Sequence, residues 1–363
     1  MNPSSFYSGT YAEARAKFLE TCAAQGLRVE HHIHPKRGRE GEELATDVAR
    51  FGPENASHVL FTQSATHGVE GFCGSGAQVG ALQSGLYDDL PDSMAVVLVH
   101  AINPYGFSWL RRVTHENVDL NRNHLEHGQP YPVNEGYEQL KDAICPVSWT
   151  PEARASARAT LEAYAEAYGP MALQGALSGG QYSHPEGLFF GGHQTTWSAK
   201  TMAAVAGKHA ASARHVGWID YHTGLGPYGY GELISDHLLG DPGHARLVDW
   251  LGESDVTNTD DGSSTSAPLT GVNSLCVAGA APHATVTMVT PEFGTSPVDE
   301  VLDSLRADCW LHNHGDLDSY QGRAIKAEIR RCFYPDADDW KAMVFERTSD
   351  TERKMIAGLA TLD

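Results

Sequence analysis

Four short apolar runs constrain the fold of this chain most. They cover residues 58–62, 94–99, 216–221 and 284–289, and glycine, proline or asparagine residues flank them. Their hydrophobicity is continuous rather than alternating, which is typical of strands that are covered on both faces. Each run therefore predicts a buried strand.

Helical patterns lie between and after these runs. We expect helices over residues 11–24, 152–168, 298–312 and 320–332, and a further strand near 27–32. Strands that alternate with helices predict an α/β fold. The 363 residues contain no repeat and no linker, so we expect a single domain with a mixed, mainly parallel sheet flanked by helices. Residues 125–213 are long for a connection and include a stretch rich in glycine and aromatic residues. We interpret them as an insertion that walls the active site.

Composition excludes several classes of protein. The formal net charge of −20 argues against a nucleic-acid partner, which requires a basic surface. The sequence contains no run of about 18 consecutive apolar residues, so we expect no membrane-spanning helix. The N-terminus has neither the basic start nor the apolar stretch of a secretory signal, so we expect a cytoplasmic protein. The six cysteines form no CxxC pair, which excludes a zinc ribbon, and free thiols are the expectation.

Polar motifs follow each of the four runs. THGVEG (66–71) follows the first run, and NPYG (103–106), Arg111-Arg112 and NVDLNRN (117–123) follow the second. The third leads into DYHTG (220–224) and the fourth into PEFGT (291–295). Ligands of open α/β sheets bind beyond the carboxyl ends of the strands. We therefore expect these side chains to meet at one edge of the sheet.

Two histidines and one carboxylate among these motifs suit a metal ion. His67 and Glu70 are three residues apart, and His222 stands at the end of another predicted strand. Zinc in catalytic sites is held by such nitrogen and oxygen donors, with one position left open for water.

The ordered set HGVE, NPYG, RR…NVDLNRN, DYHTG and PEFGT resembles the zinc carboxypeptidase (carboxypeptidase A-like) superfamily. It is most similar to a bacterial subgroup of uncharacterised carboxypeptidase-like hydrolases. The resemblance covers residues 59–295 apart from the predicted insertion. It implies one Zn²⁺ per chain, bound by His67, Glu70 and His222, and hydrolysis of an amide or peptide bond. It also implies that Glu292 is the general base and that Arg112 stabilises the oxyanion.

The same resemblance assigns the substrate side of the site. Asn121 and Arg122 match the pair that binds a substrate carboxylate, so the expected partner is a small molecule or peptide that carries one. Arg111 is the alternative to Arg112, and Asp220 is a candidate anchor for a metal ligand. The oligomeric state is not predicted.

One departure from the superfamily leaves the reaction open. Its carboxypeptidases carry a mobile tyrosine on a loop before the catalytic glutamate, but residues 233–318 contain no tyrosine. Tyr182, Tyr228 and Tyr230 are the alternatives for this role. An N-acyl amino acid deacylase resembling aspartoacylases would need no such tyrosine. A non-catalytic zinc-binding module of the same fold is the third possibility.

Overall fold

The computed structural model describes residues 2–363, and within them nine strands form one sheet. The strand order is β1-β2-β4-β3-β5-β9-β7-β8, and β6 also pairs with β9. The strands are β1 (Val29–Arg37), β2 (Glu43–Phe51), β3 (His58–Gln63), β4 (Met94–His100), β5 (His215–Asp220), β6 (His222–Tyr228), β7 (Gly231–Ser235), β8 (Val256–Thr257) and β9 (Thr285–Gly294).

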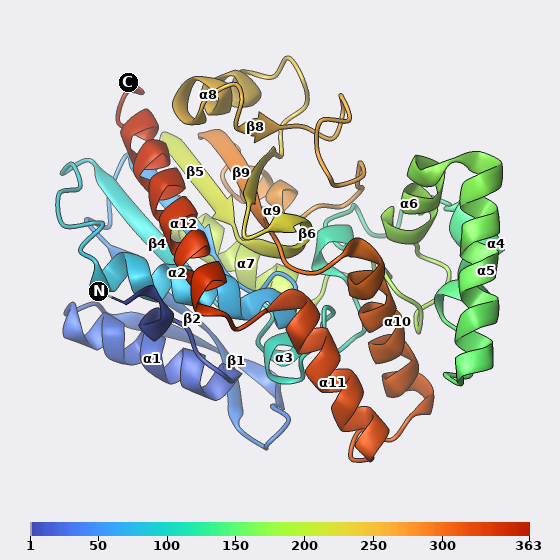
Figure 1. Ribbon diagram of the computed structural model, residues 1–363. Coiled ribbons are helices and arrows are strands. Elements are labelled where there is room, and N and C mark those ends of the chain that lie inside the picture. Colours follow the sequence, from blue (N-terminus) through green and yellow to red (C-terminus); the bar gives the residue numbers. More distant parts are fainter. Residues whose placement is uncertain (1) are drawn as a thin grey trace.

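Helices connect and cover these strands (Figure 1). The α-helices are α1 (Tyr11–Ala24), α2 (Gly71–Gln83), α3 (Pro104–Ser108), α4 (Glu135–Ile144), α5 (Pro151–Tyr168), α6 (Pro170–Ser178), α7 (Trp197–His209), α8 (Pro242–Leu251), α9 (Ser274–Ala280), α10 (Val298–His314), α11 (Tyr320–Phe333) and α12 (Asp338–Leu359). Three 3₁₀ turns are η1 (Pro3–Phe6), η2 (Gly68–Glu70) and η3 (Leu120–Arg122).

The four predicted runs are the four central strands, which confirms the predicted architecture. β4, β3, β5 and β9 are neighbours and all run parallel, whereas β1 pairs antiparallel with β2, β2 with β4 and β7 with β9. The mixed, mainly parallel sheet is therefore the one expected. The strand predicted near residues 27–32 is β1, which continues to Arg37.

Both faces of the sheet are covered, as the continuous hydrophobicity predicted. Successive side chains of a strand point to opposite faces. Leu60 of β3 accordingly belongs to a core with α1, α2, α8 and α12, and its neighbours Val59 and Phe61 belong to a second core with α7 and α9. Figure 1 shows α12 and α2 in front of the sheet and α7 behind it.

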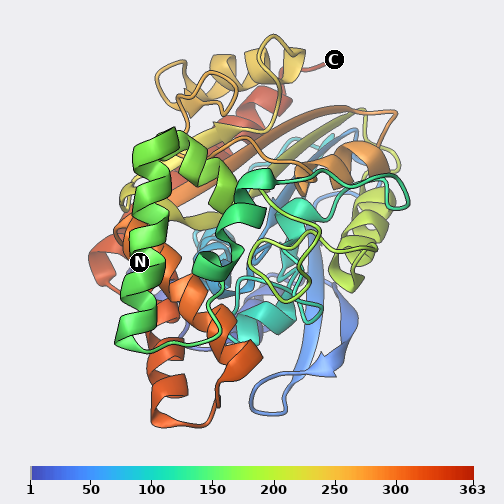
Figure 2. The same ribbon diagram turned by 90° about the vertical axis from the view of Figure 1, so that its right-hand side faces the viewer.

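A third group of helices lies beside the sheet rather than on it. α4, α5 and α6 share a core with α10 and α11, and Figures 1 and 2 show this group at one side of the molecule. Residues 125–213 therefore divide in two, because α7 packs on the sheet and α4 to α6 do not. That the segment is an insertion remains a prediction. Between residues 2 and 363, no helix has the length and apolarity needed to cross a bilayer.

Candidate metal centre

The three predicted metal ligands lie at the carboxyl ends of two neighbouring strands. His67 precedes η2 shortly after β3, Glu70 is the last residue of η2, and His222 opens β6 directly after β5. β3 and β5 run parallel with Gln63 opposite Asp220, so the two strands end side by side. Residues distant in sequence are thereby brought to one point.

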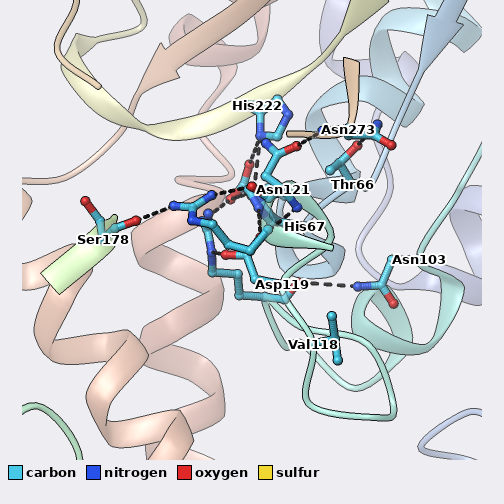
Figure 3. Close-up of polar contacts among 12 residues, drawn as sticks. Thr66, His67, Asn103, Val118, Asp119, Asn121, Ser178, His222 and Asn273 are labelled. Carbon is cyan, nitrogen blue, oxygen red and sulfur yellow. Dashed lines mark hydrogen bonds and ion pairs between the residues drawn. The ribbon is translucent and has the colours of Figure 1, made fainter. Parts of the chain in front are cut away.

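The ligand atoms converge closely. His67 Nδ1 lies 3.0 Å from Glu70 Oε1, and His222 Nδ1 lies 3.2 Å from Glu70 Oε2. The two Nδ1 atoms are 3.1 Å apart (Figure 3), and all three residues are buried. A tetrahedral zinc ion bound at about 2.0–2.1 Å would space two nitrogens by roughly 3.3 Å. The donor set therefore fits zinc.

A carboxylate lies behind each imidazole. His67 Nε2 is 3.0 Å from Asp119 Oδ1, and His222 Nε2 is 3.0 Å from Asp220 Oδ2. The Thr66 hydroxyl, 2.8 Å from both Asp220 oxygens, donates to that carboxylate. Such partners place the proton on Nε2 and leave the Nδ1 lone pair free for a metal. Asp220 thus lies beside His222, and its role as an anchor remains a prediction.

The surroundings favour positive charge where the ligand atoms meet. Burial raises the pKa of Glu70, but the charge of His67 and hydrogen bonds from both imidazoles outweigh burial, so the pKa is lowered. For His222, burial lowers the pKa, but Asp220 and Glu70 outweigh it and raise the pKa well above its usual range. A bound cation would replace these protons.

Glu292 of β9 faces the same point. It lies opposite His222 in the β6–β9 pairing, and its Oε1 accepts a hydrogen bond of 2.9 Å from the Leu225 N–H. Burial and the nearby charge of Glu70 raise the pKa of Glu292 to about 8, against the opposing effects of His222, Leu225 and Arg112. A carboxyl with a pKa near neutrality can both accept and return a proton.

Arg112 and Arg111 point to different surroundings. Arg112 Nε donates to Asp119 Oδ2 at 2.9 Å, its Nη1 lies 3.3 Å from Glu70 Oε1, and it lines the cavity. Arg111 does not line the cavity, because its Nε donates to Asp308 at 3.2 Å and its Nη2 to Asn117 at 2.9 Å. The structure therefore places Arg112, and not Arg111, at the cavity, and the roles of both arginines remain predictions.

Asn121 and Arg122 line the cavity as expected. Asn121 Oδ1 accepts the Asn273 N–H at 3.0 Å, which leaves its Nδ2 as the free donor (Figure 3). Arg122 donates to the main-chain oxygens of Asn121 and Ser178, and its buried Nε has no hydrogen-bond partner among the described residues. Burial lowers the pKa of Arg122 to about 10.

Sequence reasoning missed three residues of the site. Asp119 contacts His67 and Arg112 and also accepts the Asn121 N–H. Asn273 Nδ2 lies 3.3 Å from Asp220 Oδ2. The Phe189 ring centroid lies 5.2 Å from the Arg112 guanidinium carbon and 5.7 Å from that of Arg122. Asp119 stands within the NVDLNRN motif, but no sequence signal identifies Asn273 or Phe189.

Most of these functional groups open onto one cavity of about 1070 Å³, which is lined by His67, Arg112, Asn121, Arg122, Phe189, Asp220, His222 and Glu292. No tyrosine lines it in the described part of the chain. The Tyr182 hydroxyl donates to Arg122 O, and the exposed Tyr228 bonds to Asp339. Tyr230 is also exposed. None of the three alternatives thus takes the place of the superfamily's mobile tyrosine in this structure.

Comparisons with known proteins identify the family of this chain and the solved structures that it resembles. A model of the family described as "Protein of unknown function (DUF2817)" matches residues 7–347. No curated protein matches the chain. One similar solved structure is carboxypeptidase A from Helicoverpa armigera, with 14% identity, 94% of this chain and 74% of that chain covered, and a TM-score of 0.48.

Two further similar structures have names that point to different functions. One is bovine thrombin-activatable fibrinolysis inhibitor in complex with tick carboxypeptidase inhibitor, at 12% identity, 96% and 97% coverage and a TM-score of 0.46. The other is succinylglutamate desuccinylase from Chromobacterium violaceum, at 13% identity, 88% and 74% coverage and a TM-score of 0.38. The carboxypeptidase resemblance predicted from the motifs is found again here. At these identities and TM-scores it carries nothing about activity.

Proposed function

This chain belongs to the DUF2817 family, and we propose that it is a zinc-dependent hydrolase that cleaves an amide or peptide bond in a small substrate with a carboxylate. One observation carries the proposal. His67, Glu70 and His222 turn their donor atoms to one buried point, and Glu292 faces the same cavity. An HxxE motif alone would be weak support, but its three-dimensional convergence with a second histidine and a carboxyl base supports metal-assisted hydrolysis.

Each residue of the site has a separate role in the proposed reaction. A zinc ion on the three ligands supplies polarisation of a carbonyl and a more acidic water. Glu292, whose pKa is raised to about 8, takes a proton from the attacking water and delivers it to the leaving amine. Arg112 is held by Asp119 and Glu70 before substrate arrives, so its charge is already in place for the developing oxyanion.

Asn121 and Arg122 are the proposed carboxylate site. Arg122 is almost completely buried, and its Nε lacks a partner in the described structure. A buried donor without an acceptor is costly, and a substrate carboxylate would satisfy it. The free Nδ2 of Asn121 supplies a second donor. A planar guanidinium and an amide together suit the two oxygens of a carboxylate.

Deacylase activity is better supported than C-terminal exopeptidase activity. Carboxypeptidases of the superfamily that this chain resembles use a tyrosine, and no tyrosine among residues 2–363 lines this cavity. The zinc ligands, Glu292 and the arginines suffice for removal of an acyl group from an amino acid. Comparing turnover of C-terminal dipeptides with that of N-acyl amino acids distinguishes the two activities.

Metal analysis and three variants test the proposal. We expect about one zinc per chain in the wild type, and loss of both metal and turnover in His67→Ala and His222→Ala. Glu292→Gln should keep the metal but lose turnover by at least about 100-fold, because the proton shuttle is gone. His314→Ala, which removes an exposed histidine of α10, is the matched control and should behave as wild type.

Different results identify the competing possibilities. Equal turnover by wild type and Glu292→Gln would contradict the catalytic assignment. A zinc-loaded wild type that turns over neither dipeptides nor N-acyl amino acids would support a non-catalytic zinc-binding module. Circular dichroism of each variant checks that the fold is retained.

A further inference from the structure

We propose that the substrate carries a long, uncharged apolar group, which lies against a wall built by α6 and α10. This inference deepens the proposed function and rests on it. The apolar wall consists of Leu173 and Leu177 of α6 and of Val301, Leu302 and Leu305 of α10, all of which line the cavity. Both helices belong to the group beside the sheet (Figure 1).

The size of the cavity is the first argument. At about 1070 Å³ it is slightly larger than the range of about 300–1000 Å³ that is usual for small-molecule sites. His67, His222, Glu292, Arg112 and Arg122 make up only a small part of its lining. A short acyl group on an amino acid would leave the apolar wall facing water, and water beside apolar side chains is readily displaced by an apolar group.

The charges that line the cavity are the second argument. Among the described lining residues, the only lysine or arginine side chains are Arg112 and Arg122. Both already have roles, one at the oxyanion and one at the carboxylate. Three further lining residues, Asp236, Asp260 and Asp299, are acidic. A second carboxylate, such as that of a succinyl group, would find no free cation and would face these acids.

The exposed apolar residues of the lining are the third argument. Leu238, Leu275 and Val298 all line the cavity, and their exposed fractions are 66%, 51% and 65%. Large apolar side chains that are exposed along one cavity mark a surface that receives an apolar ligand. The apolar lining is therefore not confined to the wall, which gives space for a long chain.

Binding to the zinc-loaded Glu292→Gln protein tests the inference without turnover. Calorimetry would compare the N-acetyl, N-octanoyl and N-succinyl derivatives of alanine. Each buried methylene should raise affinity by about four-fold at most. We expect N-octanoylalanine to bind at least about 100-fold more tightly than N-acetylalanine, and N-succinylalanine to bind no more tightly than N-acetylalanine.

A wall variant locates the effect. Leu173 and Leu302 are only partly buried, and glutamine is compatible with a helix, so Leu173→Gln/Leu302→Gln should fold. We expect it to lower the octanoyl-to-acetyl affinity ratio at least ten-fold. Met343→Gln, on the exposed side of α12 and outside the cavity, is the control and should keep the ratio.

Several outcomes would overturn the inference: equal affinity for the octanoyl and acetyl compounds, tightest binding of the succinyl compound, or no binding of any of them. A wall variant that folds and keeps the full ratio would overturn it as well. The chain-length series uses the intact wall, so it decides the question even if the double variant does not fold. Failure of the proposed function is seen separately, as absence of turnover by the wild type of compounds that it binds.

Discussion

Asp119 shows how single side chains hold this site together. Its carboxylate is completely buried and contacts His67 Nε2, Arg112 Nε and the Asn121 N–H. The pKa of Asp119 lies well below its usual value, because Arg112 and His67 outweigh the effect of burial. One residue thus joins a proposed metal ligand, the arginine proposed to stabilise the oxyanion and the proposed carboxylate site.

Replacing Asp119 should therefore weaken metal binding. In Asp119→Asn, His67 loses the carboxylate that fixes its tautomer and raises its basicity, so we expect zinc affinity to fall by about 10- to 100-fold. Competition with a chromophoric chelator measures it. Asp92→Asn, at an exposed position, is the control. Unchanged affinity in Asp119→Asn would show that the contact does not orient the ligand.

The neighbouring arginines should respond oppositely to the same substitution. Lysine keeps the charge but loses the planar fork. We expect Arg112→Lys to lower kcat/KM by about 100-fold or more, the effect usual for an oxyanion donor. Arg111→Lys should lower the melting temperature, because Arg111 is bonded to the buried Asp308, and should leave kcat/KM within about three-fold. The reverse pattern would assign the oxyanion to Arg111.

At the scale of elements, two of the sequence motifs form one packing unit. η2 and the His67 before it form the HGVE motif, α3 and the Asn103 before it begin the NPYG motif, and the two elements touch at Gly68. A Cβ on Gly68 would lie 2.0 Å from the carbonyl carbon of Gly106 and 2.2 Å from the Phe107 nitrogen. Main-chain atoms cannot yield as a flexible side chain can. The position of His67 and Glu70 therefore depends on a glycine between them.

Gly68→Ala should consequently lose stability and zinc together. We expect a lower melting temperature and weaker metal binding, because η2 must move away from α3. Gly207→Ala is the matched control, since a Cβ there meets nothing within 4 Å and the residue lies inside α7. That substitution should stabilise the protein by about 0.5–1 kcal/mol. Equal behaviour of the two variants would contradict the close contact.

Sequence patterns predicted the strands that are continuously apolar and missed elements that are rich in glycine. β3, β4, β5 and β9 are continuous apolar runs, but β6 contains Gly224, Gly226 and Pro227 and was not predicted. α2 was missed because it contains four glycines. Those glycines allow close approach, since a Cβ on Gly76 would lie 2.3 Å from the Tyr7 ring. Tertiary packing overrides local propensity here.

The residues of the site can likewise be separated into those that sequence patterns predict and those that they do not. The proposed metal ligands stand at or shortly after the ends of strands and Glu292 lies near the end of β9, so strand order and direction suffice to bring them together. Arg111 and Arg112 stand on a loop, where only tertiary contacts decide which side chain faces the cavity. Phe189 reaches the arginines from a segment about 70 residues further along the chain, which no local pattern specifies.

At the scale of the whole molecule, α12 ties the end of the chain to the sheet through a buried carboxyl. Glu352 accepts hydrogen bonds from the hydroxyls of Tyr87 and Tyr221. Burial raises the pKa of Glu352 to about 7, although both tyrosines lower it. The folded protein thus favours the protonated carboxyl more than the unfolded chain does.

This difference predicts how stability depends on pH. A raised folded-state pKa means that the stabilisation is complete below the unfolded pKa of about 4.3 and is lost as the pH rises through about 7. Glu352→Gln is neutral at every pH and lacks this loss. Relative to wild type, the variant should gain about 2–3 kcal/mol between pH 5 and pH 8. Urea unfolding of both zinc-saturated proteins measures the difference, in which the titration of the metal ligands cancels. A constant difference would show that Glu352 is ionised throughout.

The placement of α4, α5 and α6 beside the sheet has a consequence for how such an enzyme can diversify. The proposed reacting groups come from strand ends and the turns that follow them, whereas part of the cavity lining comes from α6, which shares a core with α10 and α11. Residues 135–178 could thus be exchanged or randomised with the catalytic apparatus left intact. A library confined to that stretch would yield catalysts that share one reaction and differ in the molecules they accept.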